Sequence, residues 1–176
     1  MKTFRSKKIL AAVVLAAVIT VGCTVPSWVT TVENDATLGA SIALSLVTVI
    51  DPTLIPLVSL IQTGLNALEK VINDFKAQPT ATNLQAVQAA ANAVEANVQQ
   101  LESAAQVKNA ASATRITAVV TVLVGAVDEI ISQIPPSAAA AALGVSNTTQ
   151  KPKGAKYWKN QYNKAIKGNP QFRPLK

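Results

Sequence analysis

Hydrophobic residues recur along the middle of the chain at alternating intervals of three and four positions, which places them on one face of an α-helix. The clearest run lies between Asp51 and Pro79. Asp51-Pro52 is typical of a helix start, because Asp caps free backbone N–H groups and proline fits the first turn. Gln78-Pro79 indicates its end. We therefore predict a helix over residues 52–77 with a heptad seam. The seam residues are Leu54, Val58, Ile61, Leu65, Leu68, Ile72 and Phe75.

Two later stretches have the same spacing. The first follows Thr82, which with Gln85 predicts a capping box. The second ends at Pro135-Pro136, and residues 108–114 (KNAASAT) predict the turn between the two helices. The seam of the first comprises Leu84, Val87, Ala91, Val94, Val98, Leu101 and Ala105. That of the second comprises Ile116, Val120, Leu123, Val127, Ile130 and Ile134.

One more helix is predicted over residues 32–50, where the chain is apolar nearly all round and therefore deeply buried. Thr30 with Glu33 predicts a capping box at its start. Three consecutive seams with short connections favour antiparallel neighbours. The predicted fold class is all-α, an up-down antiparallel four-helix bundle over residues 32–134. Small seam residues leave limited apolar area in each layer, so we also expect a homo-oligomer.

The two apolar stretches around Asp51-Pro52 allow a second interpretation. Residues 36–50 and 53–68 would form the arms of a hairpin that inserts into a membrane. Each arm is shorter than the ~20 residues of a membrane-spanning helix, and Ser and Thr recur in both. The core of a bundle is therefore the preferred interpretation.

Residues 1–22 have the organisation of an export signal. Residues 1–8 are basic, residues 9–19 (ILAAVVLAAVI) form an unbroken apolar run, and Thr20-Val21-Gly22 leads to Cys23, the chain's single cysteine. A basic segment, an apolar segment of this length and small residues after it define a secretory signal. Extended through Val25, the run approaches the length of a membrane helix, so an uncleaved N-terminal membrane anchor is the alternative.

Thr20-Val21-Gly22-Cys23 resembles the lipobox of bacterial lipoproteins, with Thr20 where that family usually has Leu. The resemblance implies a diacylglycerol joined to Cys23 by a thioether, cleavage before Cys23, and a place in the bacterial cell envelope. Two or more acyl chains hold a protein stably on a membrane. Thr24, in place of Asp, resembles sorting to the outer membrane, facing the periplasm. Residues 23–31 then form a tether to the bundle.

Charge is distributed unevenly along the chain. Residues 23–149 carry nine acidic and four basic side chains, whereas residues 150–176 carry eight basic and no acidic ones. An Ala-rich turn and linker over residues 135–154 lead to a basic aromatic tail over residues 155–176, which is predicted to form a short amphipathic helix. The tail residues predicted to bind a membrane or polymer are Lys156, Trp158, Lys159, Tyr162, Lys164, Ile166 and Lys167.

Several partners suit this tail. A basic helix with an aromatic face is typical of contact with anionic lipid at a membrane interface, and peptidoglycan in the cell wall is a second candidate. Docking on the acidic body and a solvated, disordered terminus are further alternatives. Lys and aromatic residues also suit nucleic acid, but export to the envelope argues against it.

The composition excludes common catalytic machinery. The chain has no His, the commonest general base and transition-metal ligand. A single Cys excludes an intramolecular disulfide, and no Gly-rich phosphate loop or Ser nucleophile motif occurs. We therefore predict that the protein is not an enzyme and has no catalytic residue, metal site or cofactor.

Together these features predict a non-catalytic, lipid-anchored envelope protein. Its helical bundle would serve as a binding or structural module, and its basic tail would contact the membrane or cell wall. The alternative function is that of a membrane-inserting protein, such as a pore former or a phage lysis or exclusion factor, that uses the hairpin around Asp51-Pro52.

Overall fold

The computed structural model describes residues 25–47, 52–106, 110–136 and 151–176. Within these ranges all regular secondary structure is helical, which confirms the all-α prediction. The elements are α2 (Ser27–Val47), the 3-10 helix η1 (Pro52–Leu54), α3 (Ile55–Ala77), α4 (Ala81–Gln106), α5 (Ala110–Gln133) and α7 (Gly154–Ala165).

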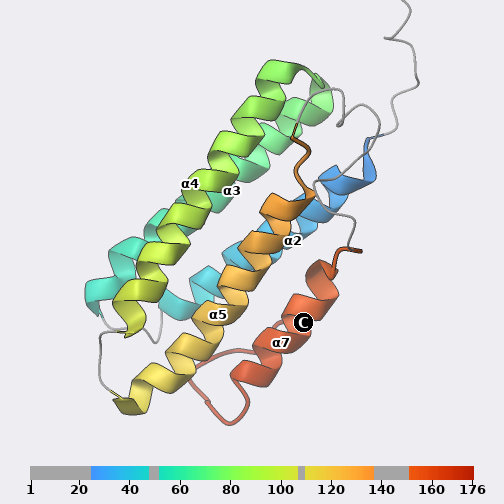
Figure 1. The fold of residues 1–176 in the computed structure, drawn as a ribbon. Helices are drawn as coiled ribbons and strands as arrows, with labels where there is room; N and C mark the ends of the chain where they lie inside the picture. Colours follow the sequence, from blue (N-terminus) through green and yellow to red (C-terminus); the bar gives the residue numbers. More distant parts are fainter. Residues whose placement is uncertain (1–24, 48–51, 107–109, 137–150) are drawn as a thin grey trace, which may run out of the picture.

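The four long helices lie side by side (Figure 1). α2 packs against α3 and α5, and α4 packs against the same two helices from the other side. Each long helix therefore contacts its neighbours in the sequence, and α2 also contacts α5. α7 lies outside this group, along α2 and α5 (Figure 1).

The predicted seams form the core between these helices. All seven seam residues of the predicted helix 52–77 are buried, and so are all seven on α4. On α5 five of the six are buried and Ile116 is half-buried. α2 contributes Trp28, Val29, Val32, Ala36, Ile42, Ala43 and Leu46. The heptad spacing was therefore a sound guide to which side chains face inward.

α2 begins earlier than the predicted Val32. It starts at Ser27, so the predicted tether over residues 23–31 loses its C-terminal part to the helix. The physical reason is burial of Trp28, whose ring packs on Phe75 of α3 with ring centroids 5.4 Å apart. The predicted Thr30–Glu33 capping box is wrong, because Thr30 lies inside α2. Glu33 instead pairs with Lys76 of α3, with Nζ 2.9 Å from Oε2.

The start of α4 also differs from the prediction. The hydroxyl of Thr80, rather than Thr82, accepts the backbone N–H of Asn83 at 3.2 Å, and α4 begins at Ala81. The side-chain amide of Asn83 donates to the carbonyl oxygen of Gln78 at 2.7 Å, which ties the start of α4 to the end of α3. The hydroxyl immediately after Pro79 therefore caps the helix.

The predicted breaks at prolines hold. α3 ends at Ala77, before Gln78-Pro79, and α5 ends at Gln133, before Pro135-Pro136. α5 begins at Ala110, inside the predicted turn over residues 108–114. The helix predicted from Pro52 begins as the short η1 and continues as α3, while Asp51 lies outside the described residues.

Candidate interaction surface

The basic aromatic tail folds back onto the rest of the protein. Trp158, Tyr162 and Ile166 form one side of α7, and all three are buried. We predicted that these side chains contact a membrane or polymer. In the described fold α7 packs on α2 and α5, as in the alternative of docking on the body, and contact with a membrane or polymer stays a prediction. A helix with an apolar face buries it wherever a complementary surface is near, and this protein supplies one.

The groove under α7 is shaped by a small residue on α5. The indole ring of Trp158 lies directly on Gly125, where a Cβ atom would fall 2.5 Å from Cη2 of the ring. Farther along α7, the Tyr162 hydroxyl donates a hydrogen bond to Oγ of Ser45 on α2 at 2.7 Å. These two contacts fix α7 to both helices of the groove. The sequence analysis missed Gly125, which lies outside the seam of α5; a glycine within a predicted helix is the signal that marks such a close approach.

The last residues of the chain turn back beside α7. Gly168 has φ of 81°, in the left-handed region that favours glycine. The side chain of Asn163 then binds the backbone of Leu175 twice, accepting from its N–H at 2.8 Å and donating to its carbonyl at 3.0 Å. Phe172 is buried. We call residues 169–176 the C-terminal arm, and these contacts attach it to α7.

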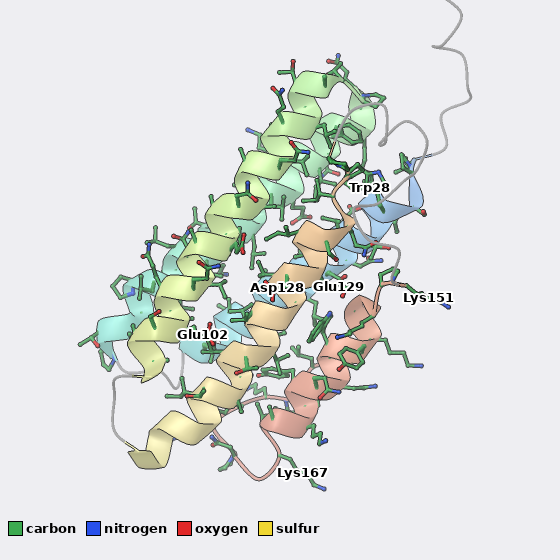
Figure 2. The ribbon with its side chains drawn as sticks, in the orientation of Figure 1. Trp28, Glu102, Asp128, Glu129, Lys151 and Lys167 are labelled. Carbon is green, nitrogen blue, oxygen red and sulfur yellow. The ribbon has the colours of Figure 1, made fainter. Side chains whose placement is uncertain are left out.

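Most lysines of α7 and its flanking segments are exposed. At 100° per residue, Lys156 and Lys164 lie on the side of α7 away from Trp158 and Tyr162, whereas Lys159 borders the aromatic side and is half-buried. Figure 2 shows Lys151 and Lys167 extending away from the ribbon. We call this surface the basic flank; it comprises Lys151, Lys156, Lys159, Lys164 and Lys167.

Acidic residues lie on all four long helices. Glu69 and Asp74 are exposed on α3, and Glu95 and Glu102 are half-buried on α4. On α5, against which α7 packs, Asp128 is exposed and Glu129 is half-buried (Figure 2). The basic flank is therefore close to the carboxylates of α5 and separated from those of α3 and α4.

One carboxylate is buried in the interior. Asp35 of α2 is 0% exposed, and neither of its oxygens has a hydrogen-bond partner among the described residues. Burial, helped by the negative charge of Glu129 on α5, raises the pKa of Asp35 to about 7. The sequence analysis missed this residue. The signal that marks it is an acidic side chain on the inward face of a predicted buried helix.

Polar groups also gather where α7 begins. Oε1 of Glu129 accepts the backbone N–H of Lys153 at 3.0 Å. The ammonium group of Lys153 lies 5.2 Å and 5.3 Å from the ring centroids of Tyr157 and Trp158, respectively, within the range of a cation–π contact. Nε1 of Trp158 is buried without a hydrogen-bond partner among the described residues. We call Asp35, Glu129, Lys153 and Trp158 the α7 junction.

The remaining predicted sites are only partly described. Cys23 and the whole predicted signal lie outside the described residues, as does Asp51 at the corner of the predicted hairpin. Within the described ranges, no group of three or more acidic, His or Cys side chains is arranged to hold a metal ion.

Both arms of the predicted hairpin contribute buried side chains to the core, Ile42 and Leu46 from α2 and Val58 and Ile61 from α3. The described helices include one apolar window long enough to cross a membrane, Ile116–Gln133 of α5, and 44% of it is buried inside the protein. A core helix of a water-soluble protein has the same length and composition, so this window alone does not indicate a membrane span.

Comparison with known proteins found no matching family model and no significant match among curated proteins or solved structures. The functional argument therefore depends on the residues and contacts of this chain.

Proposed function

We propose that this protein is a non-catalytic, lipid-anchored component of the bacterial cell envelope that presents a basic surface to an anionic partner. The orientation of α7 carries the proposal. Its aromatic side docks on α2 and α5, which leaves Lys156, Lys164 and Lys167 exposed. Each Lys near an anionic membrane contributes ~1 kcal/mol of attraction, and the basic flank has five.

The body that holds α7 is proposed to be an up-down antiparallel four-helix bundle. Each long helix packs on its neighbours in the sequence, and α2 packs on α5. Only residues 78–80 connect α3 to α4, and a connection this short joins helices that run in opposite directions. Such a bundle would act as a rigid support, because it fixes the direction in which α7 points.

The lipid anchor would keep the basic flank close to the membrane. Residues 24–26 alone separate Cys23 from the start of α2. A segment of this length reaches at most about 14 Å when fully extended. A lipid on Cys23 would therefore hold α2, and with it α7, beside the bilayer. Such tethering raises the effective concentration of a second, weaker contact, which favours anionic lipid over peptidoglycan as the partner.

The anchor is tested by the intact mass of the protein extracted from bacterial membranes. A mass equal to residues 23–176 plus a diacylglycerol, with or without an additional acyl chain, is the expected result. A mass equal to the full chain of 176 residues would contradict lipidation and favour an uncleaved N-terminal anchor.

The basic flank is tested by lysine labelling of the full chain in vesicles with and without phosphatidylglycerol. We expect an amine-reactive reagent to modify Lys156, Lys164 and Lys167 more slowly when the anionic lipid is present. Lys70, exposed on α3, serves as the internal control and should react equally in both. Equal labelling of the α7 lysines in the two vesicle types would contradict a lipid-facing basic flank.

The alternative of membrane insertion through α2 and α3 is less well supported, because insertion would remove core side chains such as Ile42 and Ile61 from their present contacts. Release of a trapped dye from anionic vesicles distinguishes the two functions. A surface-bound protein leaves the dye inside, whereas a pore former releases it.

A further inference from the structure

The α7 junction brings a buried acid next to the contact that starts α7. Asp35 on α2 lies close enough to Glu129 on α5 for their charges to interact, and Glu129 accepts the N–H of Lys153 just before α7. One helical turn before Glu129, Gly125 carries the ring of Trp158. Asp35 and Glu129 therefore belong to the two helices that form the groove under α7.

We propose that protonated Asp35 keeps α7 docked in this groove, and that ionisation of Asp35 releases α7 so that its aromatic side binds an anionic bilayer. The lipid partner in this inference rests on the proposed function. Release itself depends only on the contacts within the chain.

Ionisation favours release because a charged carboxylate needs water or a hydrogen-bond donor, and Asp35 has neither in the docked fold. Water reaches Asp35 only when a neighbouring helix moves. α7 has 12 residues and lies outside the long helices, so separating it disrupts less packing than separating α3 or α4. Release also exposes Glu129 to water, which screens its repulsion of Asp35.

The charged groups around Asp35 also leave its ionised form unfavourable in the docked fold. From α5, Glu129 repels an ionised Asp35. From the segment before α7, Lys153 directs its ammonium group onto two aromatic rings instead of a carboxylate. From α3, the ammonium group of Lys76 is paired with Glu33. In this arrangement the described cations do not neutralise Asp35.

The pH range over which α7 is released follows from the pKa of Asp35 in water and in the docked fold. Asp35 has an ordinary pKa of 3.8 in water, and burial raises it to about 7 in the docked fold. Docking is therefore strongest below about pH 4, weakens as the pH rises toward 7, and changes little above that. The difference between these two pKa values limits the change in the docking equilibrium constant to about a thousandfold.

Hydrogen exchange of backbone amides in the full chain, solubilised in detergent, tests the release. We expect the protection of α7 amides, corrected for the intrinsic effect of pH on exchange, to fall up to a thousandfold between about pH 4 and pH 7. Amides of α4 should stay better protected than those of α7 at every pH. Equal protection in α7 and α4 would overturn the proposal, since α7 would then open only by global unfolding.

Substitutions at two positions, Asp35 and Asp74, make this test specific. Asp35→Asn removes the titrating group at nearly constant size and should leave α7 protection independent of pH; Asp35→Leu serves the same purpose if the amide is poorly tolerated. Asp74→Asn, at an exposed site on α3, should behave like the unsubstituted chain. A titration that persists in the Asp35 variants would overturn the proposal.

The lipid partner is tested separately by fluorescence. The chain has two Trp residues, so Trp28→Phe leaves Trp158 as the reporter. In vesicles of brominated phosphatidylglycerol, bromine should quench Trp158 more at about pH 7.5 than at about pH 5, and Asp35→Asn should remove the difference. If α7 amides titrate but Trp158 is not quenched, the lipid partner is refuted while release stands.

Discussion

Asp35 shows how strongly position changes the chemistry of one side chain. An exposed Asp ionises easily, but this one is fully buried on the inward side of α2. Its ionised form is therefore disfavoured, which raises its pKa to about 7. Because the raised pKa belongs only to the folded state, this acid lowers stability as the pH rises.

Replacing Asp35 should consequently stabilise the protein at neutral and alkaline pH. Relative to the unsubstituted chain, the unfolding free energy of Asp35→Asn should increase by up to about 4 kcal/mol between about pH 4 and pH 8. Urea unfolding at the two pH values measures this difference. A constant difference would show that Asp35 does not titrate with folding.

Gly125 is the residue on which the docking of α7 depends most directly. A methyl group at this position would overlap the Trp158 ring. Gly125→Ala should therefore weaken docking, at a cost of about 1–3 kcal/mol for overpacking, partly offset by the better helix propensity of Ala. Hydrogen exchange in α7 should increase while exchange in α4 stays low.

Gly39→Ala provides a matched control for that substitution. Gly39 also lies in a long helix, but a Cβ there would be 3.5 Å from Leu65, an ordinary contact distance. Exchange in α7 should be unchanged by this variant. An equal effect of the two substitutions would show that the Trp158 contact does not control docking.

At the scale of elements, the C-terminal arm is attached to α7 by few contacts. The arm contacts α7 through Asn163, and the Tyr162 hydroxyl lies 3.3 Å from the Arg173 carbonyl as well as bonding Ser45. Two backbone groups of Leu175 depend on a single side chain. The arm should therefore detach without α7 when that side chain is removed.

Asn163→Ala tests this expectation. Loss of its two hydrogen bonds should cost about 1–3 kcal/mol locally, so backbone amides of residues 171–176 should exchange faster while those of α7 change little. Asn160→Ala, at an exposed position on the same helix, is the control and should have no effect. Faster exchange throughout α7 would mean that the arm is needed for docking.

Over the whole molecule, basic side chains are concentrated in the basic flank, whereas the described acidic residues are spread over α2, α3, α4 and α5. Such an arrangement orients a protein in the field of an anionic surface. With a lipid on Cys23, the short segment before α2 would add a second constraint. The two together favour one orientation on the bilayer, with the basic flank toward the lipid headgroups.

This orientation should depend on salt. The screening length shortens from about 10 Å at 0.1 M salt to about 3 Å at 1 M. In the Asp35→Asn variant, in which α7 stays docked, the protection of α7 lysines from labelling in phosphatidylglycerol vesicles should therefore disappear at high salt, while the lipid anchor keeps the protein in the vesicle fraction. Protection that survives 1 M salt would indicate apolar insertion of α7 instead of contact through charge.

The helices and their inward faces were predictable from the sequence because both depend on the order of residues over a few turns of the chain. A repeat of three and four residues fixes which side of a helix is apolar, so Leu65, Val94 and Leu123 were assigned correctly to the core. Prolines remove a backbone donor, so the ends of α3 and α5 were also predictable. The helix starts were less predictable, because burial of Trp28 outweighed the capping signal at Thr30.

Only the tertiary structure decided what the tail contacts and what surrounds Asp35. The sequence determined that α7 would have an aromatic side and a basic side. However, a membrane and a groove between helices can each bury the same apolar side chains. The choice depends on Gly125 and Ser45, which lie 33 and 117 residues from their partners Trp158 and Tyr162. The inward position of Asp35 on a buried helix was a signal in the sequence, but its lack of a hydrogen-bond partner is set by neighbours on other helices.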